Sequence, residues 1–191
     1  MPVAGQVIHL PNSYMQFILI DRILDLEPGC KIVAIKNLTL AEEYLAEHFP
    51  GFPVLPGVLM LEAAAQASAW LVRFSQDFAH SITVLKSARA IRYGNFVPPG
   101  GQLNIEARIV RMDERQAELQ VRGTLENVTA LSGRIVMESY NVRDREAGTE
   151  CLDQSIIAEL KNRFRLLARD WLRGREHRPD QALREVAGAT S

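Results

Sequence analysis

The chain has 191 residues, of which 47% are hydrophobic and 24% charged, and its formal net charge is −1. This composition supports one globular core with an appendage, and the near-neutral charge gives no indication of nucleic-acid binding. Two cysteines, Cys30 and Cys151, are too few for a disulfide framework or a metal cluster, and we expect free thiols in a cytoplasmic protein. We expect no signal peptide, and the longest apolar run, 58–72, is too short to span a bilayer.

The first part of the chain predicts two strands and two helices around a proline-rich loop. A buried and then alternating strand is expected over 17–26 and a second strand over 31–40, joined by the turn Glu27-Pro28-Gly29. A short helix over 41–47 leads into the loop. A long helix follows over about 57–74, where Ala, Leu and Met dominate and apolar residues occupy nearly every face. Such a helix should be surrounded by other structure.

Apolar and polar residues alternate in three later segments, around 103–109, 117–125 and 134–138. A period of two is typical of antiparallel strands that bury one face and expose the other to water. One apolar helix with several amphipathic strands predicts an α+β fold in which the sheet curls around the helix.

The composition changes after Tyr140. A polar linker is expected over 141–150, followed by an amphipathic helix that Asp153 or Ser155 caps. The apolar positions of this helix recur at steps of three and four and form one stripe, namely Ile157, Leu160, Phe164, Leu167 and Trp171.

We therefore expect a main domain over 1–141 and a linker with a helical extension over 142–191, disordered from about residue 174. Seven basic residues lie between Lys161 and Arg178. They are candidates to dock an acidic carrier protein or an anionic membrane surface. We favour the alternative that they form the solvated face of a helix packed on its own body.

A histidine and a carboxylate bracket the proline-rich loop. Between Phe49 and Val72, Glu62 is the single charged side chain, and His48 lies fourteen positions before it. A lone carboxylate in an apolar helix is costly unless it is paired or has a task. A titratable base and an acid around an apolar segment favour acid–base chemistry on an apolar substrate. The alternatives are an exposed His48 and a structural Glu62 bound to backbone.

This segment resembles the β-hydroxyacyl-acyl-carrier-protein dehydratases of type II fatty acid synthesis. The resemblance rests on His48-Phe49-Pro50-Gly51-Phe52-Pro53-Val54-Leu55-Pro56-Gly57-Val58-Leu59-Met60-Leu61-Glu62 and on Gln66. Further similarity before and after it extends the match over about 10–141. The resemblance implies the hot-dog fold, a sheet wrapped around one central helix, and a homodimer with shared active sites. Some members of the family assemble as trimers of dimers.

The resemblance also implies a reaction, the dehydration of (3R)-3-hydroxyacyl thioesters on acyl carrier protein to trans-2-enoyl thioesters, without cofactor or metal. His48 would take the proton next to the thioester carbonyl, and Glu62 of the partner subunit would donate to the leaving hydroxyl. Backbone N–H groups at Gly57 and Val58 would polarise the thioester oxygen. The candidates to line the acyl tunnel are Phe49, Leu61, Ala65 and Trp70. We expect Gln66 to have a structural role, in which it packs or hydrogen-bonds at a dimer interface, rather than to touch the substrate.

Several positions depart from the family's pattern and leave two alternatives open. Glu47 stands where the family has glycine, and Asn12-Ser13 and Gly94-Asn95 replace basic pairs. One alternative is a hot-dog acyl thioesterase, which uses a carboxylate and water, although the His-Phe-Pro-Gly motif argues against it. The other is a non-catalytic acyl-binding or scaffolding paralogue.

Overall fold

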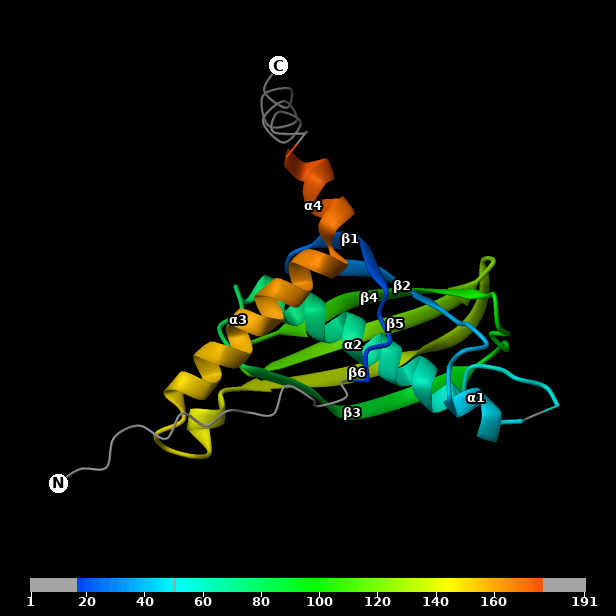
Figure 1. Ribbon diagram of the computed structural model, residues 1–191. Helices are drawn as coiled ribbons and strands as arrows, with labels where there is room; N and C mark the ends of the chain where they lie inside the picture. Colours follow the sequence, from blue (N-terminus) through cyan, green and yellow to red (C-terminus); the bar gives the residue numbers. More distant parts are fainter. Residues whose placement is uncertain (1–16, 50, 177–191) are drawn as a thin grey trace, which may run out of the picture.

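The computed structural model describes residues 17–49 and 51–176, in which one antiparallel sheet wraps around one long helix (Figure 1). The sheet has six strands in the order β1-β2-β4-β5-β6-β3. The strands are β1 (Arg22–Glu27), β2 (Lys31–Asn37), β3 (Ile82–Tyr93), β4 (Gln102–Met112), β5 (Gln116–Leu125) and β6 (Val128–Tyr140). The helices are α1 (Tyr44–Glu47), α2 (Gly57–Ser75), the 3-10 turn η1 (Val142–Asp144), α3 (Glu150–Leu167) and α4 (Arg169–Glu176).

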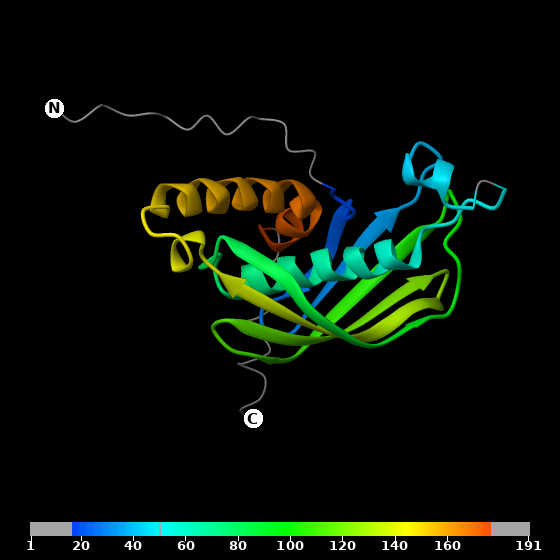
Figure 2. The same cartoon turned by 90° about the horizontal axis from the view of Figure 1, so that it is seen from below.

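The expected central helix is confirmed to within one residue, because α2 begins at Gly57 directly after Pro56 and ends at Ser75. Figure 2 shows α2 between the curved sheet on one side and α3 on the other. Its small residues Ala63, Ala64 and Ala67 are fully buried, which allows α2 and the sheet to pack closely.

The alternating pattern predicted three of the strands correctly. Leu103, Ile105 and Ala107 of β4 are fully buried, and they pair with β5, whose Leu119 and Val121 point into the same core. The chain then turns into β6 through Glu126–Asn127, both with positive φ angles of 49° and 69°. This two-residue turn matches the right-handed twist of the strands that it joins.

The structure corrects the first strand and the two segments before the loop. The expected strand over 17–26 begins only at Arg22, and Phe17 and Ile18 are exposed beside α2. The second strand ends at Asn37. The N–H of the next residue, Leu38, binds the carbonyl of Gly101, directly before β4. The short helix forms only over Tyr44–Glu47.

Strand β3 was not predicted. It lies at the sheet edge, pairs only with β6, and its register shifts at Leu85/Ser87 and again between Arg89 and Arg92. Each irregularity breaks the period of two, so a rule based on alternation misses this strand.

The helical extension packs on the body of the protein, as the alternative that we favoured expects, but Arg163 lines a cavity instead of the solvated face and Arg178 lies outside the described residues. Phe164 stacks on Phe74 of α2 with ring centroids 4.8 Å apart, and it also contacts Phe78, Trp70 and Trp171. The predicted stripe is interrupted at Ala168, where α3 ends and α4 begins. The disorder expected from residue 174 is wrong for 174–176, which belong to α4, and otherwise concerns 177–191, outside the described residues.

The expected helix cap is wrong. Helix α3 begins after Thr149, and neither Asp153 nor Ser155 lies at the cap position. Asp153 is only 2% exposed, and its carboxylate accepts hydrogen bonds from the Ser81 hydroxyl and from the N–H groups of Val142 and Arg143, at 2.8 and 3.2 Å for the two amides. This carboxylate ties α3 to the turn that precedes it and to the start of β3.

Candidate active site

His48 and Glu62 lie in two separate cavities of the chain. His48 lines a cavity of about 420 Å³ near the start of α2, together with Phe49, Gly57 and Tyr93. Glu62 lines another cavity, of about 490 Å³, between α2, β3 and α3. Neither of these two cavities therefore contains both the candidate base and the candidate acid.

A tight turn carries the imidazole of His48. His48 follows the last residue of α1, and its N–H binds the carbonyl of Tyr44. The next residue, Phe49, has a φ of 53°, a left-handed conformation that costs an L-residue about 1 kcal/mol or more. The Phe49 ring packs edge to face on the imidazole of His48, with the two ring centroids 4.5 Å apart. A strained turn next to a candidate base is a common feature of functional sites.

The start of α2 offers free backbone donors beside His48. No side chain caps this helix, and no acidic residue lies in its first turn. The first N–H groups that bind within the helix are those of Leu59 and Met60, both to the carbonyl of Pro56. The N–H groups of Gly57 and Val58 therefore have no acceptor inside the helix and lie at its positive end. They can bind an oxygen that gains negative charge.

Gly57 also makes room for an aromatic ring. A Cβ atom at this position would lie 3.2 Å from the ring of Tyr93 on β3. Glycine thus lets Tyr93 pack on the start of α2, where the ring forms one wall of the His48 cavity.

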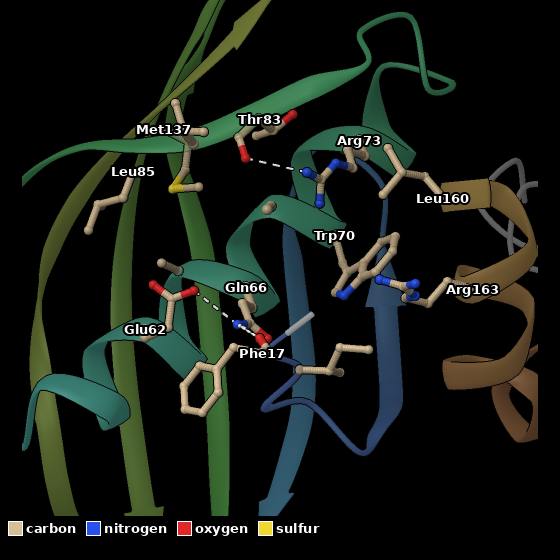
Figure 3. Close-up of a pocket in the computed structure, with 14 residues that line it drawn as sticks. Phe17, Glu62, Gln66, Trp70, Arg73, Thr83, Leu85, Met137, Leu160 and Arg163 are labelled. Carbon is tan, nitrogen blue, oxygen red and sulfur yellow. Dashed lines mark hydrogen bonds between the residues drawn. The ribbon is translucent and has the colours of Figure 1, made fainter. Parts of the chain in front are cut away.

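Gln66 holds the carboxylate of Glu62, one helical turn away (Figure 3). Gln66 Nε2 donates to Glu62 Oε1 at 2.9 Å and to the carbonyl of Phe17 at 2.9 Å, while Gln66 Oε1 accepts from the N–H of Leu19 at 2.9 Å. The amide therefore fastens segment 17–19 to α2 and orients the carboxylate at the same time. These bonds give Gln66 a structural role within one chain, and its expected place at a dimer interface stays a prediction.

The remaining predicted residues divide between the two cavities. Phe49 and Gly57 lie with His48, whereas Ala65 and Trp70 lie with Glu62. Leu61 and Val58 line neither cavity in the single chain, and the Val58 side chain is 69% exposed. The expectations attached to the Glu47 side chain and to Asn12-Ser13 lie outside what the structure describes.

Two arginines in the Glu62 cavity were missed. Arg73 comes from the last turn of α2 and Arg163 from α3 (Figure 3). Burial, and after it the charge of Arg163, lowers the pKa of Arg73 from its ordinary value to about 10, so its guanidinium stays charged at neutral pH. A basic residue at the end of an apolar helix was the available signal, but it usually indicates helix-dipole compensation.

The described part of the chain gives no support to a metal site or to a membrane-spanning helix. No group of three or more His, Cys, Asp or Glu residues is placed to hold a metal ion there. No helix within residues 17–49 and 51–176 is long and apolar enough to cross a membrane.

Comparison with known proteins agrees with this architecture. The model of the FabA-like domain family matches residues 10–139. A 3-hydroxyacyl-[acyl-carrier-protein] dehydratase FabZ of Ruminiclostridium cellulolyticum is 36% identical over 126 residues, which are 66% of this chain and 88% of the relative. The FabZ of Listeria monocytogenes is 41% identical over 117 residues, which are 61% of this chain and 81% of the relative.

Among solved structures, a chain of the dehydratase heterocomplex ApeI:P from Xenorhabdus doucetiae is similar, with a TM-score of 0.57 and 19% identity. The match covers 67% of this chain and 86% of that one. The fold class is thereby confirmed as a hot-dog fold, in which a sheet wraps around a single helix. The chain belongs to the FabA-like domain family and, within it, to the 3-hydroxyacyl-[acyl-carrier-protein] dehydratases. These relatives do not favour the thioesterase alternative.

Proposed function

We propose that this chain dehydrates (3R)-3-hydroxyacyl thioesters, carried by acyl carrier protein, to trans-2-enoyl thioesters in fatty acid or related acyl synthesis. The observation that carries the proposal is the motif that runs from His48, directly after α1, to Glu62, in the first half of the apolar helix α2. Relatives with 36–41% identity bear the name of this activity. We place the reaction in the domain 1–141, with 142–191 as an extension, and the protein in the cytoplasm.

In the proposed mechanism, His48 removes a proton from the carbon next to the thioester carbonyl. The electron pair forms the carbon–carbon double bond, and the bond to the 3-hydroxyl breaks. Glu62, in its acid form, gives its proton to the departing hydroxyl, which leaves as water. The N–H groups of Gly57 and Val58 stabilise the charge that develops on the thioester oxygen. One proton then passes from the imidazolium to the carboxylate, which restores both groups.

We also propose that two copies of the chain complete each site, with His48 from one copy and Glu62 from the other. The separation of the two residues into different cavities supports this arrangement. The edge strand β3 supports it as well, because its outer side has no neighbour among the described strands. A free edge invites pairing with another chain. A homodimer is therefore the proposed working form, with trimers of dimers as a higher assembly.

Enoyl-thioester absorbance tests the proposed function directly. With 3-hydroxyacyl chains on acyl carrier protein, the wild-type protein is expected to turn over. His48→Ala and Glu62→Gln are each expected to lower kcat by about 10² or more, since each removes a general acid or base. His80→Ala, a histidine outside both cavities, is the matched control and should keep full activity. Wild-type rates in folded Glu62→Gln protein would refute the assignment.

A further inference from the structure

The cavity that Glu62 faces continues past the carboxylate and ends at two arginines. We call this cavity the acyl groove. Its walls come from α2, from β3 and β6, and from α3 of the extension. The middle of the groove is apolar and is formed by Ala65, Ala69, Trp70, Leu85 and Met137. Arg73 and Arg163 lie at the end away from Glu62 (Figure 3). The groove is thus acidic at one end, apolar in the middle and cationic at the other end.

The guanidinium of Arg73 is only partly satisfied by the protein. One of its terminal nitrogens donates to the carbonyl of Thr83 at 3.3 Å, and its Cζ lies 5.2 Å from the centroid of the Trp70 ring. Its buried Nε has no hydrogen-bond partner among the described residues. A buried N–H without an acceptor costs about 1–3 kcal/mol. An oxygen acceptor that reaches the guanidinium from the groove would add to these few contacts.

No carboxylate of the described chain balances this charge. Glu62 is the single acidic residue among those that line the groove, and it sits at the opposite end, bound to Gln66. Glu159 pairs with Arg163 at 2.8 Å, but its own side chain is 61% exposed, so this contact lies toward the solvent. Residues 1–16, which precede Phe17 in the groove wall, contain no Asp or Glu. Among the described residues, the half-buried cation of Arg73 therefore faces the cavity without a counter-charge.

The spacing suits an acyl chain of medium length. Arg73 follows Glu62 by eleven residues on one helix, a rise of about 16 Å. A saturated chain with bonds of about 1.5 Å and angles near 111° advances about 1.25 Å per bond. Roughly a dozen bonds, fewer where the Arg73 side chain reaches back, would connect the reacting carbons near Glu62 to the guanidinium.

We propose that the acyl groove selects acyl chains with a carboxylate at the far end, which Arg73 binds and Arg163 attracts. The substrate class is then an ω-carboxy 3-hydroxyacyl thioester of medium length, and Arg73 is a specificity-determining residue. This inference rests on the proposed dehydratase function. It also gives the extension a task, because Arg163 and the neighbouring wall residue Leu160 belong to α3.

Turnover of paired substrates tests the inference. The substrates are 3-hydroxyacyl thioesters of ten to fifteen carbons that end in a methyl group or in a carboxylate. Wild-type kcat/KM is expected to be at least tenfold higher for the carboxylate-ended chain at the best length, since a charge-assisted hydrogen bond contributes about this factor. Arg73→Met should lower that preference at least tenfold, and Arg73→Lys should restore part of it because the charge returns without the planar fork.

The matched controls lie on α3. Arg163→Gln should lower the preference by a smaller factor, whereas Arg165→Gln, on the exposed face of the same helix, should leave both substrates unchanged. A wild-type preference for the methyl-ended chain that Arg73→Met leaves unaltered would overturn the inference while the dehydratase function stands. Arg73 would then serve only to compensate the dipole of α2.

A binding measurement separates this inference from the reaction itself. Decanoate and 1-decanol are titrated into the full chain, with tryptophan fluorescence as the signal, because Trp70, one of the two tryptophans, lies beside the guanidinium. Decanoate is expected to bind at least tenfold tighter to the wild-type protein than to Arg73→Met, and decanol to bind both proteins alike. Equal decanoate affinities would overturn the anion site. Arg73-dependent binding without any dehydration would support the anion site and refute the proposed function instead.

Discussion

Glu62 shows how a single charge in an apolar helix is accommodated. Its carboxylate is half-buried and does not rely on a cation, because the neutral amide of Gln66 donates to it. The same amide is itself held by the backbone of Phe17 and Leu19. The network thus fixes the orientation of the carboxylate in the cavity that it lines.

Gln66 is therefore expected to be a positioning residue for Glu62. Gln66→Leu keeps the volume of the side chain but removes the hydrogen bond to the carboxylate, so kcat should fall about tenfold. KM should change less than kcat if the main role of Gln66 is to orient Glu62, although the substitution also removes the hydrogen bonds that hold Phe17 and Leu19. Gln76→Leu, at the end of the same helix and away from both cavities, is the matched control. A Gln66→Leu protein in which KM rises and kcat is unchanged would assign Gln66 to the substrate rather than to Glu62.

Sequence reasoning was strongest for residues whose role is local. The charge of Glu62 and the base of His48 stand out because the neighbouring sequence is apolar and proline-rich. Arg73 could not be recognised in the same way. Its partial satisfaction depends on β3 and α3, which approach it from positions 83 and 160–163, and no local pattern states that these segments meet there.

At the scale of elements, the same distinction separates α2 from β3. Helix α2 has a sharp proline start and a uniform apolar composition, so its bounds follow from the sequence. Strand β3 lies at an edge with two register shifts, so its burial does not alternate. The extension lies between these cases. Its stripe predicted a packed helix, but the break at Ala168 and the anchoring role of Asp153 depend on tertiary contacts.

Asp153 is the element-scale anchor of α3, and its removal should loosen the extension. Burial opposes ionisation, but hydrogen bonds from Ser81, Val142 and Arg143 prevail and lower the pKa of Asp153 below 3.8. Asp153→Asn loses these charge-assisted bonds and should reduce the free energy of unfolding by about 2–4 kcal/mol at pH 7. Urea unfolding followed by tryptophan fluorescence is the measurement, because both tryptophans of the chain, Trp70 and Trp171, contact Phe164.

The pH dependence of this effect has a defined sign. A carboxylate whose pKa is lowered by folding stabilises the protein above its unfolded value, near 3.8, and loses this effect as the pH falls through the folded value. The difference between wild type and Asp153→Asn should therefore be constant near neutral pH and shrink below about pH 4. Glu150→Gln, in the exposed first turn of the same helix, controls for the helix dipole. A difference that grows as the pH falls would contradict the assignment.

At the scale of the whole molecule, the two edges of the sheet differ. Edge strand β1 lies beside α4, with Arg22 and Asp170 forming an ion pair at 3.5 Å. Edge strand β3 has no such neighbour in the described part of the chain, and its residues Ala88, Arg89 and Ala90 are exposed. A second copy can therefore add to the sheet at β3 more readily than at β1. Sequence reasoning alone could not assign this edge, because β3 itself was not predicted.

Complementation between inactive variants tests the shared site. The His48→Ala and Glu62→Gln variants are unfolded together in equal amounts and refolded so that their subunits can pair with one another. Dehydration is then measured. If each site takes one residue from each copy, half of the dimers are mixed, and each mixed dimer has one intact and one doubly inactive site. Activity should then recover to about a quarter of the wild-type value. The matched control is the double variant, which carries both His48→Ala and Glu62→Gln in one chain, mixed with the wild-type protein. If each site takes both residues from one chain, the mixed variants stay inactive, because every site then lacks either the base or the acid.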